Sequence, residues 1–166
     1  MKALQALILL LVLTPCQAKT LTVDASGSGD ALNLQDAVHL AGDGDSILLL
    51  PGDYSGATVD KSLNISGQKG ASLKGSLTVA APGCTISHLN LSGPEDGPAI
   101  SLASSGSLLL GCNISSLANA VSMSGDDNRV ERCTIDSPRG AEILGSKNLV
   151  LGCSISGETG VVFNRT

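Results

Sequence analysis

The sequence predicts an all-β protein built as a parallel β-helix, a solenoid of short strands, with a short N-terminal capping α-helix. Three observations lead to this fold class. The second half of the chain repeats with a spacing of 19–23 residues, and two columns of apolar residues recur along these repeats. Twenty glycines accompany one Tyr, one Phe and no Trp, which suits many short strands joined by tight turns. Helical repeats are longer, at about 33 residues or more.

The first residues have the composition of a signal peptide, which we assign to residues 1–18. An unbroken apolar run extends from Leu7 to Leu13, and Pro15 then precedes small residues that end at Ala18. The run is too short for a membrane span, which needs roughly 20 apolar residues. We therefore expect an exported protein, periplasmic or extracellular, with residues 19–166 forming a single β-helix domain. A lipoprotein anchor at Cys16 is less favoured, because proline directly before the cysteine fits that pattern badly.

The charge of the chain limits its partners. The full sequence has a formal charge of −5, and removing residues 1–18 takes away one lysine and leaves nine basic and fifteen acidic residues. Nucleic acid binding is not expected, because the lysines and arginines are scattered rather than gathered in a basic stripe. An anionic polysaccharide would be repelled unless a cation bridged the two. Tyr54 and Phe163 alone cannot build the aromatic wall that many sugar sites use.

The N-terminal part reads as a strand, a helix and a second strand. Leu21–Val23 is the first strand, and Asp30 is a suitable N-cap for a helical cap over about residues 30–41. The apolar face of this segment consists of Leu34, Ala37, Val38 and Ala41. Such a helix can cover the open apolar end of the first coil. Ile47–Leu50 then reads as a buried strand.

The repeats align in columns that alternate between core and solvent. One inward column holds Leu63, Leu89, Cys112, Cys133 and Cys153, and the other holds Ile65, Leu91, Ile114, Ile135 and Ile155. The positions between them are polar in every coil: Asn64, Asn90, Asn113, Thr134 and Ser154. This alternation is the period of a strand with one buried face. A second strand is predicted at 77–79, 100–102, 121–123 and 161–163, and stacking the coils makes a continuous narrow core.

The last repeat is incomplete in the sequence. Val161–Phe163 begins one more coil, and no capping helix follows it. An uncapped end of stacked strands invites pairing with another chain. We therefore expect either a homodimer through the uncapped C-terminal coil or a truncated relative of a longer polysaccharide-active protein.

Two parts of the chain carry a resemblance to a known family. The run TVDASGSGDALNLQDAVHLAGDGDSILLLPGDYSG (residues 22–56), followed by KSLNISG, resembles the opening of pectinesterases and related pectin-lyase-like proteins. DDNRVERCTI and KNLVLGCSI, which begin at Asp126 and Lys147, are similar to later coils of the same superfamily, with cysteine where its members often stack asparagine. The resemblance covers roughly residues 20–163. It implies a right-handed parallel β-helix of the pectin-lyase-like superfamily.

The resemblance implies much less about activity. Pectinesterases carry a Gln-Asp pair in their central coils, whereas the only such pair here, Gln35-Asp36, falls in the expected capping helix. Pectate lyases use calcium-binding aspartates on neighbouring strands and an arginine base, and the sequence holds no convincing set of these. Calcium is therefore expected only if the chain is a lyase, and otherwise no cofactor is expected.

The densest polar cluster supplies the candidate catalytic residues Asp126, Asp127, Arg129 and Arg132. Carboxylates there could bind a hard cation, or an Asp/Arg pair could act as in a lyase. The structural alternative, which we favour, is a turn in which Asn128 stacks on Asn148. Asp127 would then form an ion pair with Lys147 on the next coil, and an exposed pair of that kind contributes only about 0–1 kcal/mol.

Three of the remaining cysteines, Cys112, Cys133 and Cys153, and the first three glycosylation patterns follow the repeat. The cysteines beyond the signal peptide are Cys84, Cys112, Cys133 and Cys153, and the Asn-x-Ser/Thr patterns begin at Asn64, Asn90, Asn113 and Asn164. We expect buried thiols that act as small apolar fillers, with a single bridge between neighbouring rungs left open. A zinc site is not expected, because stacked ligands lie in a line rather than in a tetrahedron. The glycosylation patterns matter only in a eukaryotic secretory pathway.

Two functions stay open. The favoured one is a secreted non-catalytic β-helix module, structural or weakly carbohydrate-binding, because catalytic motifs and aromatic platforms are missing. The alternative is a small or truncated polysaccharide lyase or pectinesterase-like enzyme acting on uronic-acid-rich glycans, which rests on the resemblance alone. A groove that gathers the cluster from Asp126 to Arg132 beside other acids or bases would favour the enzyme, and an exposed turn would favour the module. Ice binding is a weaker option, because the outward column mixes Asn, Thr and Ser.

Overall fold

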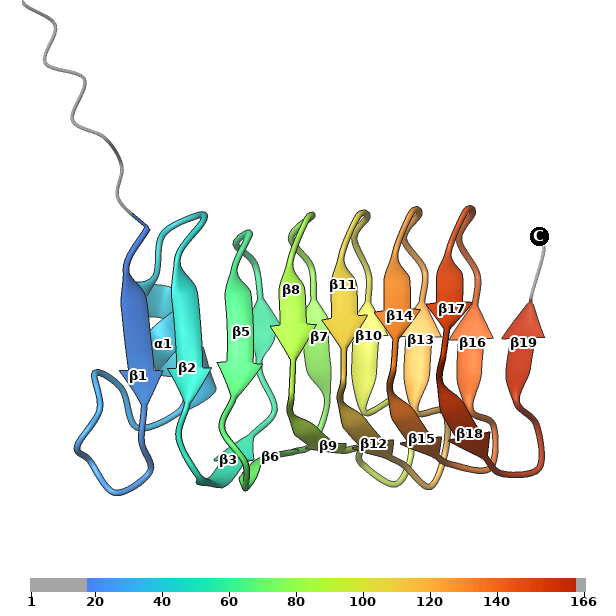
Figure 1. The fold of residues 1–166 in the computed structure, drawn as a ribbon, viewed down its shortest axis with the longest axis horizontal. Coiled ribbons are helices and arrows are strands. Elements are labelled where there is room, and N and C mark those ends of the chain that lie inside the picture. The colour runs from blue at the N-terminus through green and yellow to red at the C-terminus, as the bar shows by residue number, and fades with distance from the viewer. Residues whose placement is uncertain (1–17, 164–166) are drawn as a thin grey trace, which may run out of the picture.

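Stacked coils of short strands make up the chain. A computed structural model describes residues 18–163, which form a parallel β-solenoid (Figure 1). Successive coils add one strand to each of three parallel sheets, which we call A, B and C. The all-β solenoid and its single short helix confirm the predicted fold class. Residues 1–17 of the predicted signal peptide, with Cys16 among them, and Asn164 lie outside the described residues.

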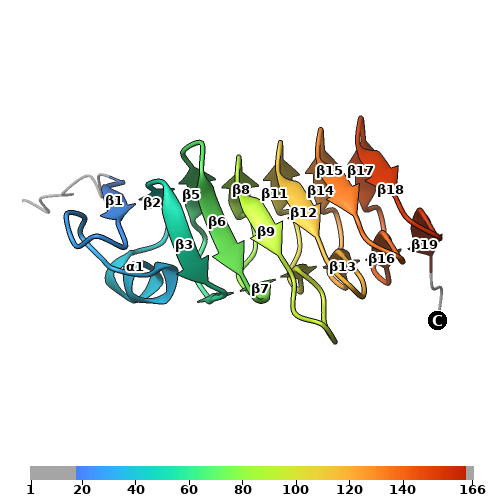
Figure 2. The same cartoon turned by 90° about the horizontal axis from the view of Figure 1, so that it is seen from below.

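The strands of each sheet follow one another in chain order. Sheet A consists of β1 (Thr20–Val23), β2 (Ser46–Leu49), β5 (Asn64–Gly67), β8 (Thr85–Ser87), β11 (Leu108–Leu110), β14 (Arg129–Glu131) and β17 (Leu149–Leu151). Sheet B consists of β3 (Gly52–Ser55), β6 (Ala71–Lys74), β9 (Asn90–Ser92), β12 (Asn113–Ser115), β15 (Thr134–Asp136) and β18 (Ser154–Ser156). Sheet C consists of β4 (Thr58–Val59), β7 (Leu77–Val79), β10 (Ile100–Leu102), β13 (Val121–Met123), β16 (Ala141–Ile143) and β19 (Val161–Phe163). Sheet A faces the viewer in Figure 1 and sheet B in Figure 2.

Most of the predicted columns are confirmed, and one coil is assigned differently. The inward row of Leu91, Ile114, Ile135 and Ile155 pairs in register along sheet B. Ile65, which the sequence placed in this row, pairs with Ile86 of sheet A, and the partner of Leu91 in the preceding coil is Leu73. The prediction was wrong for Leu63, Asn64 and Ile65 because strands of both sheets share the same alternation of apolar and polar residues.

The helix α1 (Leu34–Leu40) begins later than predicted. Its N-cap is Asn33, whose Oδ1 accepts a hydrogen bond from the Asp36 N–H at 2.9 Å. Asp30, the predicted N-cap, instead accepts hydrogen bonds from the N–H and the hydroxyl of Thr22, at 2.7 and 2.6 Å. Both residue types are good N-caps, but the buried face of the helix starts directly after Asn33. Through these hydrogen bonds, Asp30 connects the loop before α1 to β1.

Two side chains attach α1 to the first coil, where it packs against β1, β2 and β4. The Gln35 amide accepts a hydrogen bond from the Thr58 N–H at 2.9 Å and donates one to the Thr58 carbonyl at 3.4 Å. This amide takes the place of a further strand at the edge of sheet C. The Lys61 ammonium donates at 2.6–3.0 Å to carbonyl oxygens of the last turn of the helix, those of Val38, His39 and Ala41. These contacts satisfy acceptors that a helix end leaves without partners.

The core is a continuous column of aliphatic side chains inside the three sheets. Residues such as Ile47, Leu73 and Ile100 are fully buried. Val150, Cys153, Ile155 and Val161 occupy equivalent inward positions in the last described coil but are only partly buried. In residues 18–163, no helix is long and apolar enough to span a bilayer.

Candidate functional site

The structure does not bring the four candidate catalytic residues together. The turn between β13 and β14 holds Asp126 and Asp127, the outer face of β14 holds Arg129, and the following corner holds Arg132. None of them lines the grooves described below. The cluster is therefore spread along an exposed turn, a strand and a corner.

The two aspartates join neighbouring coils in different ways. Asp126 Oδ1 accepts a hydrogen bond from the Ser146 N–H at 2.7 Å, and the Asp126 N–H donates to Ser105 Oγ at 3.0 Å. The predicted ion pair between Asp127 and Lys147 was wrong, because the ion pairs of residues 18–163 join other side chains. Asp127 is held by its backbone, whose N–H donates to the Ser146 carbonyl at 3.0 Å.

The arginine on β14 is paired with a glutamate on the same strand. Arg129 Nη2 lies 2.5 Å from Glu131 Oε1, and the two side chains are 55% and 18% exposed. Residues two apart on a strand point to the same face, so this pair lies on the outer face of sheet A. The Arg129 guanidinium thus forms its ion pair within its own strand.

Asp127 and Arg132 adopt left-handed backbone conformations, with φ of 55° and 53°. Backbone strain of this kind often marks a functional site. Here the left-handed conformation recurs at the corners of several coils. His88 and Lys147, on other coils, have φ of 56°, and Gly111 has φ of 61°. Left-handed corners therefore explain both residues without a catalytic role.

The predicted asparagine ladder is confirmed and is longer than expected. The Asn128 N–H donates to Asn148 Oδ1 at 2.8 Å, and the Ser107 N–H donates to Asn128 Oδ1 at 2.9 Å. One coil earlier, the Cys84 N–H donates to Ser107 Oγ at 3.3 Å. The side chains of Asn148, Asn128 and Ser107 thus each accept a hydrogen bond from a backbone N–H on the preceding coil. This role is structural, because buried backbone donors need partners. The Asn128 Nδ2 atom is buried and has no hydrogen-bond acceptor among the described residues.

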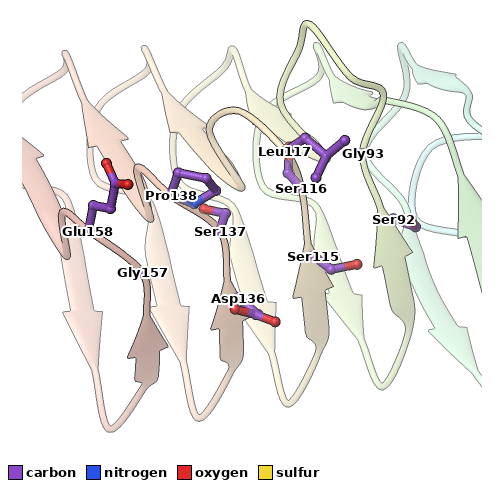
Figure 3. A pocket seen from close by; sticks show the side chains of 10 residues that line it. All are labelled: Ser92, Gly93, Ser115, Ser116, Leu117, Asp136, Ser137, Pro138, Gly157 and Glu158. Carbon is purple, nitrogen blue, oxygen red and sulfur yellow. The ribbon is translucent and has the colours of Figure 1, made fainter.

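A groove lies on a different side of the solenoid, where sheet B meets the loops that follow its strands. Its volume is about 580 Å³. Figure 3 shows the lining side chains, which come from successive coils: Ser92, Gly93, Ser115, Ser116, Leu117, Asp136, Ser137, Pro138, Gly157 and Glu158. Leu117 is 72% exposed and, with Pro138, forms the apolar part of the wall.

A second hollow of about 310 Å³ extends this groove over the outer face of β9, β12 and β15. The two hollows share Ser92, Ser115 and Asp136. The extended surface is rich in short hydroxyl and amide side chains: Ser72, Asn90, Asn113 and Thr134. Strand register places these residues on successive rungs, about 4.8 Å apart.

Hydrogen bonds between rungs hold some of the side chains on this surface. Asn113 Nδ2 donates to Asn90 Oδ1 at 3.0 Å, and Asn90 Nδ2 donates to the Ala71 carbonyl at 3.2 Å. Ser156 Oγ donates to Asp136 Oδ1 at 3.0 Å. These bonds orient two amides and one carboxylate of the face.

The two acids of the groove are not arranged as a catalytic pair. Asp136 lies on β15 and Glu158 on the loop of the next coil, and their side chains point in different directions in Figure 3. The lining residues include no histidine, cysteine, lysine or arginine. In residues 18–163, no three His, Cys, Asp or Glu side chains form a group that could hold a metal ion. The groove therefore offers hydrogen-bonding groups and the two negatively charged carboxylates of Asp136 and Glu158.

No protein-family model, curated protein or solved structure matches the chain. The groove is shallow and crosses successive coils, and hydroxyl, amide and carboxylate groups line it together with Leu117 and Pro138.

The predicted cysteine ladder is present, and its thiols are free. Hydrogen bonds from the Cys112 thiol outweigh burial and lower the pKa of Cys133 to about 7. The Cys112 N–H donates to Cys133 Sγ at 3.4 Å. The shared hydrogen bond and burial raise the pKa of Cys112. Cys84 stands apart in the Asn128 ladder, and burial raises its pKa.

The sequence interpretation missed Ser115, Asp136 and Glu158 as groove residues. Serine and isolated acids carry no motif, and the groove depends on loops that project beyond sheet B (Figure 2). The outward polar column, which includes Asn90 and Asn113, was a signal for the open part of this face.

Proposed function

We propose that this chain is an exported, non-catalytic β-helix module that binds an extended neutral polysaccharide weakly along the sheet B groove. In this proposal, residues 1–18 act as a signal peptide. The solenoid is right-handed and is related to pectin-lyase-like proteins, and binding requires no cofactor.

The observation that carries the proposal is the run of hydroxyl and amide groups over β9, β12 and β15, in which the Asn90 and Asn113 amides are held by hydrogen bonds. Ser92, Ser115 and Asp136 stand at one register position on successive rungs. A polymer that lies along the solenoid axis would meet similar hydrogen-bonding groups at every rung. Because Leu117 and Pro138 add only a small apolar wall, we expect low affinity.

The charge of the groove favours a neutral polymer over a uronic-acid-rich one. Asp136 and Glu158 are acidic, and no basic residue is among the lining residues. The whole chain has a formal charge of −5. A carboxylate-bearing glycan would therefore be repelled both at the groove and at longer range.

The contacts of Lys19 support removal of residues 1–18. The Lys19 N–H donates to Asp45 Oδ1 at 2.9 Å. Cleavage after Ala18 would turn this amide into a charged α-amino group that faces a carboxylate. Charge-assisted hydrogen bonds of this kind are roughly twice as strong as neutral ones.

The binding proposal is tested with the purified chain by retention on insoluble cellulose and by affinity electrophoresis in xylan, glucomannan, pectin and alginate, with and without calcium. Ser115→Arg places a long side chain in the groove and should abolish retention on the neutral polymers. Ser122→Arg changes a serine at the middle of β13 in sheet C and should leave retention unchanged. Absence of retention on every polymer, or equal retention of both variants, would refute the proposal.

The enzyme alternative is tested on the same panel by measuring unsaturated ends and released methanol. Turnover that Asp136→Ala or Asp127→Ala removes would show a lyase or an esterase. That result would overturn the non-catalytic proposal, whatever the retention experiment gives.

A further inference from the structure

The outer face of sheet A carries four leucines in its C-terminal half and mostly hydroxyl and amide side chains, together with Leu48, in its N-terminal half. Figure 1 shows this face toward the viewer, with no other element of the described chain laid over it. In the N-terminal half, the outward residues of β5 and β8 are Asn64, Ser66, Thr85 and Ser87. In the other half, β11 and β17 present four leucines: Leu108, Leu110, Leu149 and Leu151. Leucines on an exposed sheet face indicate an interaction surface.

An ion pair occupies the middle of the leucine half. Arg129 and Glu131 lie on β14, between β11 and β17, and the Glu131 side chain is only 18% exposed. Leu149 and Leu151 are 42% and 53% exposed, whereas Leu108 and Leu110 are half-buried. The leucine half thus has one positive and one negative group, two residues apart along β14, with a leucine pair on the strand at each side.

This arrangement is self-complementary, and we propose that sheet A is the interface of a side-by-side homodimer. A two-fold axis parallel to the solenoid axis, passing beside Val130, lays the two sheets face to face with β14 antiparallel to β14 of the second copy. Arg129 of each copy then faces Glu131 of the other. Leu108 faces Leu110, and Leu149 faces Leu151.

The same axis also places polar side chains of β5 and β8 opposite one another. Asn64 of one copy comes opposite Ser66 of the other, and Thr85 comes opposite Ser87. A two-fold axis parallel to the strands would instead place Arg129 over Arg129 and Glu131 over Glu131, and repulsion disfavours that arrangement. Charge complementarity therefore selects one of the two symmetric packings.

The size of the face sets the expected affinity. Seven strands spaced by about 4.8 Å make a face about 29 Å long, which is small for a protein interface. We therefore expect a weak dimer whose population depends on concentration. Sheet B lies on another side of the solenoid, so its grooves remain exposed in this dimer, at opposite edges.

The test is a charge exchange at the two central residues, read out by sedimentation equilibrium and light scattering at micromolar to millimolar chain concentrations. R129E and E131R each place like charges face to face and should raise the dimer dissociation constant by at least about tenfold. The double variant R129E/E131R restores opposite charges and should regain the wild-type constant. An equimolar mixture of R129E and E131R should form a heterodimer at concentrations at which each variant alone is mostly monomeric.

Circular dichroism and urea midpoints close to those of the wild type establish that each variant is folded, because both positions lie on the outer face of a strand. A chain that stays monomeric at every concentration refutes the proposal. A dimer that is insensitive to both single variants also refutes it and favours the end-to-end pairing that the sequence predicts.

Discussion

The two ends of the solenoid have the same alternation of residues but different neighbours. At the N-terminal end, α1 packs against the first coil, and Ile47 and Leu49 of β2 are fully buried. In the last described coil, Val150, Ile155 and Val161 occupy equivalent inward positions and are only partly buried. Burial in a solenoid therefore depends on the next layer as much as on the residue itself.

The largest expected effect compares one core position on two successive rungs. Ile135 is fully buried and pairs with Ile155, which is partly exposed. Ile135→Ala should lower the free energy of unfolding by about 2–5 kcal/mol, and Ile155→Ala by about 1 kcal/mol or less. Urea unfolding followed by circular dichroism measures both. Equal losses would show that another layer covers the last coil in solution.

A smaller effect is expected from the attachment of the N-terminal cap. Lys61→Met removes the ammonium group that hydrogen-bonds to the last turn of α1, and should cost about 1–3 kcal/mol. The matched control is Lys147→Met, at an exposed corner near the other end, where we expect a change within about 0.5 kcal/mol. Loss of near-ultraviolet signal from the buried Tyr54 before global unfolding would locate the damage in the first coil. Equal effects of the two variants would contradict the role assigned to Lys61.

The smallest effect is a pH dependence confined to the capped end. Hydrogen bonds from the Gly42 and Lys19 N–H groups lower the pKa of Asp45 from its ordinary value of 3.8. The folded chain therefore gains stability above that value and loses it as the pH falls through the lowered pKa. Asp45→Asn should reduce the fall in melting temperature between about pH 6 and about pH 3, measured by thermal unfolding. An unchanged pH profile would exclude Asp45 as its source.

The sequence predicts the core better than the ends. Ile114 and Ile135 were placed correctly because a strand with one buried face imposes a strict period of two. The register of Ile65 was wrong, because the early coils lack the cysteine column that marks sheet B later. The N-cap was misplaced at Asp30 because Asp30 and Asn33 suit a helix start equally well, and only the contacts with Thr22 and Asp36 distinguish them.

The groove could not be predicted, for a different physical reason. Its side chains are serines and isolated acids, which have no chemical signature in a sequence. They become a surface only when Ser92, Ser115 and Asp136 meet at one register position. The predicted cluster from Asp126 to Arg132 was dense in sequence, but strands and corners point its members in different directions.

The stacked amides of Asn90 and Asn113 have a consequence for sugar attachment. Both residues begin glycosylation patterns, and Asn113 Nδ2, the atom that would carry a glycan, donates to Asn90 Oδ1 at 3.0 Å. Glycans on both residues would leave neighbouring rungs about 4.8 Å apart and crowd one another in the folded sheet. A glycan on either rung would lie over the sheet B groove and act as a covalent competitor of any polymer that binds there.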